Sequence, residues 1–399
     1  MNAGRILLLS PYFHPEAIST GKYNTILASA LSMAGANITV VTSYPFYPSW
    51  MPKRSNAALC DVTVIRGGLW VRYPSTILLR RIVLELWYAA YVWLTIRRKR
   101  FAPDLIIAVF PPVLFFCLAK LLPGCRKVGI VHDFQGILGF SGEGRLSRAT
   151  QFIVKRVESI AFRYCDRIIV LSESMARLAH KEYGIMEQKI QVAYPFIAIT
   201  AEKRGRNKLG SILPSGVRHV VYSGALGKKQ EPRKLYDFFC AAALRIPNAR
   251  FHIFSQGPEF DNLRERHTSE PVKGVELHDL VGEEDLAELY DRSTIQVVPV
   301  AEGLSEACLP SKLPNIIASG CALFAICDEG SELANIVAKY GGMSVPRWDE
   351  HALIGSMIKF LNEIGRESSE MRRAKTAGLL KEQFSLDRLL NSVLHSPAT

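Results

Sequence analysis

Along most of the chain, short apolar runs alternate with segments whose apolar residues recur about every 3.6 positions. The runs predict strands in the first half at residues 5–9, 37–42, 62–66, 105–109, 127–131, 167–171 and 190–193. Helical spacing is typical of the segments between them, such as 23–33 and 152–164. Strands that alternate with helices predict a parallel sheet covered by helices on both faces.

The pattern changes at residues 198–216, which are polar, basic and interrupted by glycine and proline. Such a segment is typical of a domain boundary. A second alternating series follows, with strands expected at 217–223, 250–255, 275–278, 295–300, 322–326 and 342–345. The last forty or so residues have a helical pattern.

The two series predict two doubly wound, Rossmann-like α/β domains. We expect an N-terminal domain at 1–197, a C-terminal domain at 198–375, and a helical tail at 376–399 that packs back on the first domain. Ligands of such folds bind at the carboxyl ends of the strands, here in a cleft between the domains.

Composition narrows the possible partners. The chain has 399 residues, is 48% hydrophobic and 22% charged, and carries a net charge of +12. These values exclude a disordered chain, a collagen-like repeat and a small disulfide scaffold. The positive charge favours nucleic acid, nucleotide phosphates or an anionic membrane. No recognised nucleic-acid-binding motif accompanies it, so we expect no nucleic acid partner.

The eight cysteines are scattered, and several lie within apolar runs. They predict small buried hydrophobes in a reducing compartment rather than a disulfide or zinc framework. The N-terminal apolar run is too short for a signal peptide. We therefore expect a cytoplasmic protein.

Residues 80–100 place a fifteen-residue apolar stretch, with Glu85 as its only charge, between six basic residues. As a helix this stretch is about 22 Å long, which is short of the roughly 30 Å hydrocarbon core of a bilayer. Its tryptophans and tyrosines suit a helix in the headgroup region of an anionic leaflet. A buried helix with basic ends is the alternative.

Two features of the first half could carry chemistry. Gly21 comes just before a helix expected to start near Tyr23, where free N–H groups attract anions; an ordinary turn is the alternative. His132 and Asp133 follow a buried strand and could face a ligand or move a proton. Their alternative is a helix-capping aspartate beside a surface histidine.

Two features of the second half suit a phosphate. Gly224, Gly227, Lys228 and Lys229 follow a strand and precede a helix, although such lysines are commonly only solvated. Further on, Ser311 could cap a helix that ends at Gly320 and, with Lys312, hold a phosphate.

The loop before that helix is acidic. Glu302 and Glu306 could bind sugar hydroxyls, whereas their carboxylates would repel a phosphate. The alternative is that they simply form an exposed acidic loop. A Walker motif, a dinucleotide fingerprint, paired histidines and an acidic metal cluster are all absent from the sequence patterns.

Together these segments resemble GT-B glycosyltransferases of family 4, the group 1 type, and above all those of exopolysaccharide clusters such as colanic acid. PYFHPEAISTGKYNTILASALSMAGANITVVTSYPFYP is similar to the opening Y-x-P-E…G-x-G-K-Y…P-x-Y-P of that subgroup. ESIAFRYCDRIIVLSESM, YSGALGKKQ, LPSKLPNIIASG and GSELANIV are similar to later family segments, in the same order. The resemblance covers nearly the whole chain.

The resemblance implies a retaining sugar transfer, with a UDP- or GDP-linked sugar on the C-terminal domain and the acceptor on the N-terminal domain. It also implies that the enzyme uses no metal and no other cofactor. Lys229 and Lys312 would hold the diphosphate, with Gly224 allowing close approach. Leu280 and Val281 would contact the base, Gly21 would lie near the phosphates, and His132 and Asp133 near the sugar and acceptor. The remaining implied donor-site residues are Glu306, Pro310, Ser311 and Asn315.

Some positions depart from the family pattern. The family motif E-x7-E would place its first glutamate at Ala307, beside Glu306, and its second at Asn315. The colanic subgroup also lacks the second glutamate. Ala225 replaces an asparagine, Glu231 a glycine, and His132 a glutamine. The expected function is transfer of one sugar to a lipid-linked saccharide at the inner face of the cytoplasmic membrane, reached through residues 80–100. A catalytically silent nucleotide-sugar-binding protein and a GT-B nucleotide-sugar epimerase are the alternatives.

Overall fold

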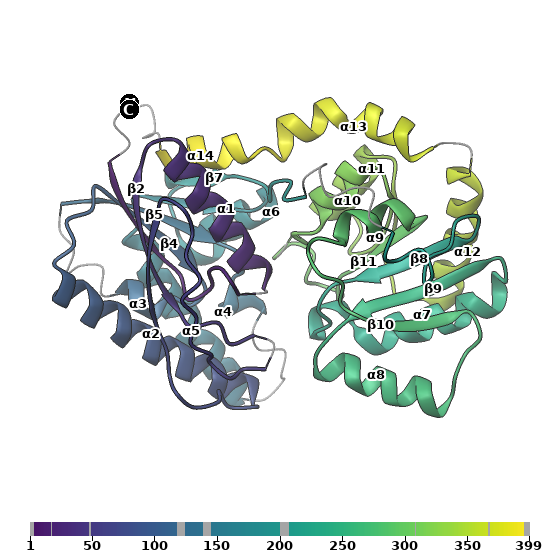
Figure 1. The fold of residues 1–399 in the computed structure, drawn as a ribbon, viewed down its shortest axis with the longest axis horizontal. Helices are drawn as coiled ribbons and strands as arrows, with labels where there is room; N and C mark the ends of the chain where they lie inside the picture. The colour runs from purple at the N-terminus through teal and green to yellow at the C-terminus, as the bar shows by residue number, and fades with distance from the viewer. Residues whose placement is uncertain are drawn as a thin grey trace. The chain divides into compact units, whose positions relative to one another are not determined.

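A computed structural model describes residues 4–16, 18–47, 49–117, 124–138, 145–199, 207–307, 309–365 and 368–394. Two compact units make up the chain: Met1–Tyr194 with Leu386–Thr399, and Pro195–Ser385 (Figure 1). The division after Tyr194 lies close to the expected one at 197. Part of the polar segment expected at the boundary, residues 200–206, lies outside the described residues.

The first unit contains, among its described residues, a seven-stranded sheet in the order β3-β2-β1-β4-β5-β6-β7. All neighbouring strands run parallel, as predicted. The strands are β1 (Arg5–Leu9), β2 (Asn37–Ser43), β3 (Val62–Gly67), β4 (Leu105–Phe110), β5 (Arg126–Val131), β6 (Arg167–Val170) and β7 (Ile190–Val192). Its helices are α1 (Ser19–Met33), α2 (Ile77–Lys99), α3 (Leu114–Cys117), α4 (Gln135–Leu138), α5 (Arg145–Arg163), α6 (Glu173–Tyr183) and α14 (Leu386–Leu394).

The core of this unit explains why its strands were visible as continuous apolar runs. All six residues of β4 are buried, because helices cover both faces of the sheet. Phe110 is packed among Phe115, Phe116 and Phe162, with ring centroids 5.5 to 6.0 Å from its own.

Helix α2 has one face in this core. Leu84, Tyr88, Ala89, Val92 and Thr95 are buried, and the Tyr88 hydroxyl donates a hydrogen bond of 2.7 Å to the Val41 carbonyl. The carboxylate of Glu85 accepts hydrogen bonds from the backbone N–H groups of Val113 and Leu114. The one charge in the apolar stretch therefore anchors the start of α3.

The second unit has a parallel sheet, six-stranded over the described residues, in the order β10-β9-β8-β11-β12-β13. Its strands are β8 (Arg218–Ser223), β9 (Ala249–Ser255), β10 (Val275–Asp279), β11 (Ile295–Pro299), β12 (Ala322–Ile326) and β13 (Met343–Val345). Its helices are α7 (Pro232–Arg245), α8 (Pro258–Ser269), α9 (Leu286–Arg292), α10 (Leu313–Ser319), α11 (Glu332–Lys339), α12 (Glu350–Ile364) and α13 (Ser369–Gln383). Each sheet order reverses beside its first strand, which is the arrangement of a doubly wound fold.

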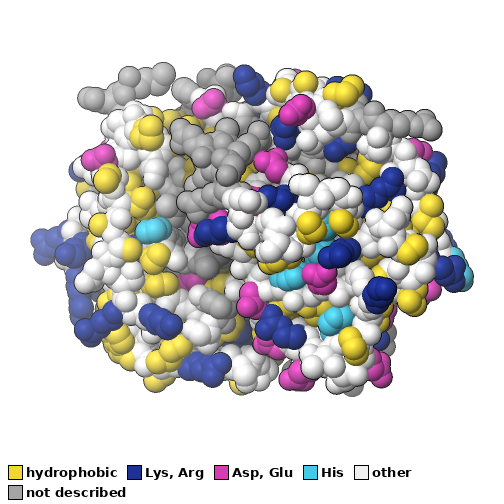
Figure 2. All heavy atoms as spheres, turned by 45° about the vertical axis from the view of Figure 1, so that its right-hand side comes forward, with side chains coloured by type: hydrophobic (Ala, Val, Ile, Leu, Met, Phe, Trp, Pro, Cys, Tyr) yellow, Lys and Arg dark blue, Asp and Glu magenta, His cyan; other side chains and the backbone are white. Residues whose placement is uncertain are grey.

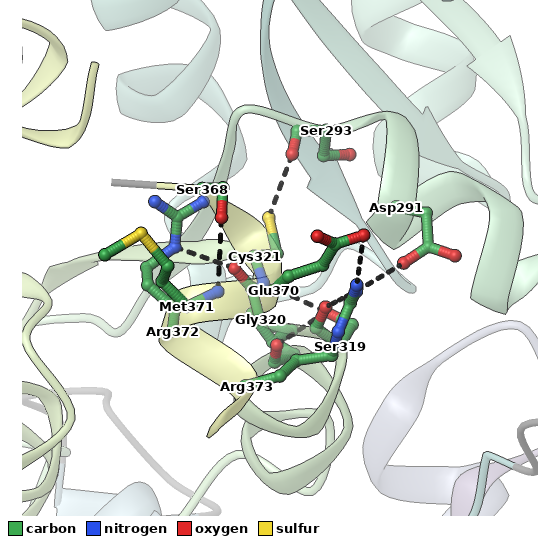
Figure 3. A network of polar contacts seen from close by, with 11 residues as sticks. Asp291, Ser293, Ser319, Gly320, Cys321, Ser368, Glu370, Met371, Arg372 and Arg373 are labelled. Atoms are coloured by element: carbon green, nitrogen blue, oxygen red, sulfur yellow. Dashed lines mark hydrogen bonds and ion pairs between the residues drawn. The ribbon is translucent and has the colours of Figure 1, made fainter. Parts of the chain in front are cut away.

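Helix α13 is fixed to the end of α10 (Figure 3). The guanidinium groups of Arg372 and Arg373 donate hydrogen bonds of 2.8 Å to the carbonyls of Gly320 and Ser319. Gly320 has φ +74°, and a Cβ there would collide with the Ser369 carbonyl of α13. These contacts satisfy the carbonyl groups that a helix leaves unpaired at its carboxyl end.

The tail therefore differs from the expected one at 376–399. Residues 376–385 belong to the second unit because α13 packs on α10, and only the segment from Leu386 joins the first unit. Arg126 donates to the carbonyls of Val393 and Leu394, and Arg167 to that of Ser392. The last residues, 395–399, lie outside the described part.

The described cysteines, seven in number, are free thiols; Cys60 is exposed, whereas Cys165, Cys321 and Cys327 are buried. Cys308 lies outside the described residues. Among the helices of the described ranges, none combines the length and the apolar character that crossing a membrane requires.

Candidate active site

Gly224 and Lys312 meet at the carboxyl end of β8. The Lys312 ammonium donates a hydrogen bond of 3.1 Å to the Ser223 carbonyl and lies 4.0 Å from the centre of the Tyr222 ring. A Cβ on Gly224 would lie 3.8 Å from that ammonium, and Gly224 has φ +144°, a conformation that favours glycine. The fold thus places a cation directly beside a stretch of backbone that a ligand can approach closely.

Lys312 is half-buried, with its ammonium against the Ser223 carbonyl and the Tyr222 ring. Burial lowers its pKa from 10.5 to about 7. A bound anion would favour the charged form and raise this pKa again. The site is therefore suited to a negatively charged group placed next to Gly224.

The loop that carries Lys229 is fixed by its backbone. The Lys229 carbonyl accepts a hydrogen bond from Ala301 N–H, and the Gly227 N–H donates to Gln230 Oε1. Residues Lys228–Gln230 form one turn of 3₁₀ helix before α7. Glu231 follows with φ +49°, in the left-handed region. Glycine, which Glu231 replaces in the motif, adopts this conformation more easily than glutamate does.

The acidic loop after β11 is ordered by Asp328. Its carboxylate accepts hydrogen bonds from the N–H groups of Gly303 and Ser305, and its own N–H donates to Ser305 Oγ. Glu302 and Glu306 are exposed on this loop. The bond from Ala301 to Lys229 places the loop next to the lysine-bearing turn.

The start of α10 differs from the expected one. Lys312, not Ser311, is the N-cap residue, and it makes no side-chain capping bond. The predicted Ser311 cap is wrong because the helix begins at Leu313, with proline in its first turn. Pro310 lies before it, and its carbonyl accepts the Leu313 N–H.

Asn315 holds the start of the second unit in place. Its Oδ1 accepts hydrogen bonds of 2.8 and 3.2 Å from the backbone N–H groups of Ala198 and Ile199, and the residue is 7% exposed. Asn315 thereby ties α10 to the start of the second unit.

Leu280 and Val281 follow the carboxyl end of β10, and Gly224 follows the carboxyl end of β8 in the same parallel sheet. Leu280 is half-buried. Val281 packs on a small core cluster of Leu209, Leu213, Val221, Phe254 and Leu289. The position after a strand fits a ligand loop, while the packing of Val281 gives this residue a structural role as well.

In the first unit, His132 and Asp133 follow β5 and are half-buried. The His132 N–H donates to the Phe110 carbonyl. Burial lowers the pKa of the His132 imidazole to about 4, against the opposing effect of Asp133. At neutral pH His132 is therefore uncharged and can hydrogen-bond a hydroxyl, but it is not a strong proton donor.

Arg81, in the first turns of α2, is a candidate site residue that belongs to no sequence motif. Burial lowers its pKa, and the negative charge of Asp133 opposes that shift. The interaction shows that α2 brings a guanidinium near Asp133. Only the packing of α2 on the sheet could reveal it, since the two residues lie far apart in the sequence.

Glu158 of α5 fixes the segment that follows His132 and Asp133. Its carboxylate accepts hydrogen bonds from the N–H groups of Gln135 and Gly136 and from the Tyr183 hydroxyl, at 2.7, 2.9 and 2.6 Å. The residue is fully buried. Burial raises the pKa of Glu158 to about 7, although these hydrogen bonds oppose the shift.

This pKa predicts a pH-dependent contribution to stability. The folded state binds the Glu158 proton more tightly than the unfolded state, so the contribution is largest below pH 4.5 and is lost as the pH rises through 7. Relative to Glu158→Gln, the free energy of unfolding of the wild type should fall by up to about 3 kcal/mol between pH 5 and pH 8. Urea unfolding at both pH values measures it.

Glu182→Gln is the matched control. The hydrogen bond from Lys155 lowers the pKa of Glu182, so its difference from the wild type should stay constant over the same range. A constant difference for Glu158→Gln too would contradict the prediction.

Gly21 lies in the first turn of α1 rather than before the helix. The helix begins at Ser19, earlier than expected, and its first hydrogen bond runs from Lys22 N–H to the Ile18 carbonyl. The Gly21 N–H is therefore one of the first-turn donors that have no acceptor within the helix. A Cβ on Gly21 would lie 3.2 Å from Glu16, whose carboxylate accepts the N–H groups of Phe46 and Tyr47.

Comparisons with known proteins identify the family of the chain. Residues 20–200 match the family model for Glycosyltransferase Family 4, and residues 217–363 match that for Glycosyl transferases group 1. The chain is 27% identical over 401 residues to the putative colanic acid biosynthesis glycosyl transferase WcaI of Escherichia coli K12, which covers 92% of this chain and 95% of the relative.

Two solved structures share the fold. Sucrose-phosphate synthase from Thermosynechococcus elongatus has a TM-score of 0.72 and 16% identity, with 96% of both chains covered. Anabaena HepE in complex with UDP-glucose has a TM-score of 0.67 and 14% identity, with 98% of both chains covered. Since the two family models span most of both units, the chain belongs to the family 4, group 1 glycosyltransferases of GT-B fold.

Proposed function

We propose that this protein is a retaining glycosyltransferase that moves a sugar from a UDP- or GDP-linked donor to a lipid-linked saccharide in bacterial cell-surface polysaccharide synthesis. The observation that carries the proposal is the Lys312 ammonium beside Gly224 at the carboxyl end of β8. The similarity to a colanic acid biosynthesis glycosyltransferase and to a UDP-glucose complex supports the substrate classes.

The donor binds on the second unit. Lys312 and Lys229 contact the diphosphate, Gly224 lets the phosphates approach the backbone, and Leu280 with Val281 lies against the base. Glu306, on the loop ordered by Asp328, faces sugar hydroxyls.

Sugar transfer needs stabilisation of the leaving nucleoside diphosphate. As the bond from the anomeric carbon to the phosphate oxygen breaks, negative charge grows on the diphosphate, and the lysine ammonium groups stabilise it without a metal ion. The acceptor oxygen bonds to the same carbon, and its proton passes to the departing phosphate oxygen. His132, neutral at pH 7, then orients acceptor hydroxyls together with Asp133 rather than acting as a strong acid.

Helix α2 provides the contact with the membrane. Leu79, Ile82, Leu86 and Leu94 lie on its outer face, spaced by three, four and eight residues, and are 42 to 58% exposed. Arg97, Arg98, Lys99 and Arg100 follow them and are exposed. Over the face of the molecule seen in Figure 2, Lys and Arg side chains lie among hydrophobic ones. One face of α2 is thus core and the other suits the headgroup region of an anionic leaflet.

A thermal-shift screen against UDP-, GDP-, ADP- and dTDP-sugars tests the donor proposal. One nucleotide class should stabilise the fold by about 2.7 kcal/mol at a hundred times its Kd. Transfer to a lipid-linked saccharide without added Mg²⁺ or Mn²⁺, with retained anomeric configuration by NMR, should follow. No shift with any donor would contradict the proposal, and a shift without transfer would favour the silent nucleotide-sugar-binding alternative.

A further inference from the structure

Three histidines form a continuous row across strands β8, β9 and β10. His219 Nδ1 lies 3.0 Å from His252 Nε2, and His252 Nδ1 lies 3.1 Å from His278 Nε2. Glu276 pairs directly with His252 in the sheet register, and its side chain points to the same face as His278, since the two are two residues apart on one strand. None of these residues has a part in the proposed sugar transfer.

The hydrogen bonds of this row fix which ring nitrogens carry protons. The Pro214 carbonyl can only accept, so His219 Nε2, at 3.0 Å from it, carries a proton. A neutral imidazole, the form that binds a metal, carries a proton on only one of its ring nitrogens. His219 Nδ1 is then an acceptor, and His252 Nε2 donates to it. His252 Nδ1 is consequently unprotonated and presents its lone pair towards His278 and Glu276.

The three atoms that meet there have the spacing of metal ligands. Glu276 Oε2 lies 3.5 Å from His278 Nε2 and 3.7 Å from His252 Nδ1, and the two nitrogens are 3.1 Å apart. Ligands about 2.1 Å from a tetrahedral zinc ion lie about 3.4 Å from one another. The three atoms therefore define one face of a tetrahedron of nearly the right size.

The surroundings resemble those of metal-binding histidines. A ligating histidine donates its second ring N–H to an acceptor that fixes its orientation, which is the relation of His252 to His219. The other carboxylate oxygen of Glu276 faces Arg250 at 3.6 Å, which leaves Oε2 for the ion. The side chains of His252, His278 and Glu276 are 0, 19 and 36% exposed, so the cluster opens to solvent at the edge strand β10.

We propose that His252 Nδ1, His278 Nε2 and Glu276 Oε2 bind a zinc-like divalent transition-metal ion, with water as the fourth ligand. In the metal-bound state, His278 carries its proton on Nδ1. The ion clamps β10 to β9 in the middle of the strands, whereas the donor residue Gly224 follows the carboxyl end of β8. Its role is structural, and the proposal does not rest on the proposed glycosyl transfer.

Titration of the full-length, tag-free protein with Co²⁺ after EDTA treatment tests the proposal. One equivalent should bind and give the visible absorption of tetrahedral Co²⁺, and Zn²⁺ should displace it. Glu276→Gln and His278→Gln should each weaken binding by at least about tenfold. His351→Gln removes an exposed histidine of α12 and should leave binding unchanged.

Thermal unfolding in EDTA provides the control for folding. Glu276 lies on an edge strand, so in EDTA Glu276→Gln should unfold at the same temperature as the wild type. Added Zn²⁺ should raise the unfolding temperature of the wild type and of His351→Gln, but not that of Glu276→Gln or His278→Gln. Absence of stoichiometric binding by the wild type would overturn the proposal. Binding that survives both Glu276→Gln and His278→Gln would overturn it as well.

Discussion

Lys312→Met should weaken binding of the donor nucleotide sugar by about 100-fold, because a hydrogen bond to a charged group contributes roughly 1.5–3 kcal/mol. The rate of transfer at saturating donor should fall further, by about 10² or more, since the same ammonium stabilises charge that develops on the leaving diphosphate. Calorimetric titration and initial rates measure the two effects separately.

The same residue predicts a pH dependence of donor binding. The pKa of Lys312 is about 7 without ligand, and a diphosphate favours the charged form, so binding takes up a proton above pH 7. Donor affinity of the wild type should therefore fall by roughly tenfold or more between pH 6.5 and 8.5, whereas Lys312→Met should show no such decline.

Lys228→Met provides a matched control, because Lys228 is an exposed lysine of the neighbouring turn. Its effect on donor affinity should be small. Lys312→Met should also fold at least as stably as the wild type, since it removes a cation that burial disfavours. Wild-type donor affinity in Lys312→Met would refute the assigned diphosphate contact.

Replacing Leu79, Ile82 and Leu86 together with serine should reduce partitioning onto anionic vesicles by about 100-fold. The exposed half of each side chain contributes about 1 kcal/mol when it enters an apolar environment, or about 3 kcal/mol for the three. Co-sedimentation with vesicles that contain phosphatidylglycerol measures the change.

The basic residues at the end of α2 predict that vesicle binding depends on lipid charge and on salt. Because Arg97, Arg98, Lys99 and Arg100 are exposed, binding should be weaker on neutral vesicles and at high salt, by about 1 kcal/mol for each basic group near the surface. Leu244→Ser is the control, since Leu244 is a 74% exposed leucine on α7 of the other unit. Unchanged partitioning of the triple variant would refute membrane contact through α2.

The fold followed closely from the sequence because burial on both faces makes parallel strands continuously apolar. The runs around β4 and β12 are examples, since every residue in both strands is buried. Helix starts were less visible where capping signals were missing. Helix α1 begins at Ser19 without a side-chain cap, and α10 begins at Leu313 after an N-cap residue, Lys312, that makes no side-chain capping bond.

The candidate site was predicted unevenly. Segment order and spacing pointed to Lys312 and Gly224, which the fold brings together. They did not reveal Arg81 or Glu158, whose relation to the His132–Asp133 segment depends on the packing of α2 and α5. Nor did they show that Asn315 holds Ala198 and Ile199.

The sequence by itself determined the two α/β units, the family and the lysine-bearing turns, since each is encoded in local periodicity and short motifs. Only the tertiary structure decided which face of α2 is exposed, that α13 stays on the second unit, and that His252, Glu276 and His278 meet. Those features arise from sheet register and helix packing, which join residues far apart in the chain through contacts that no local pattern records.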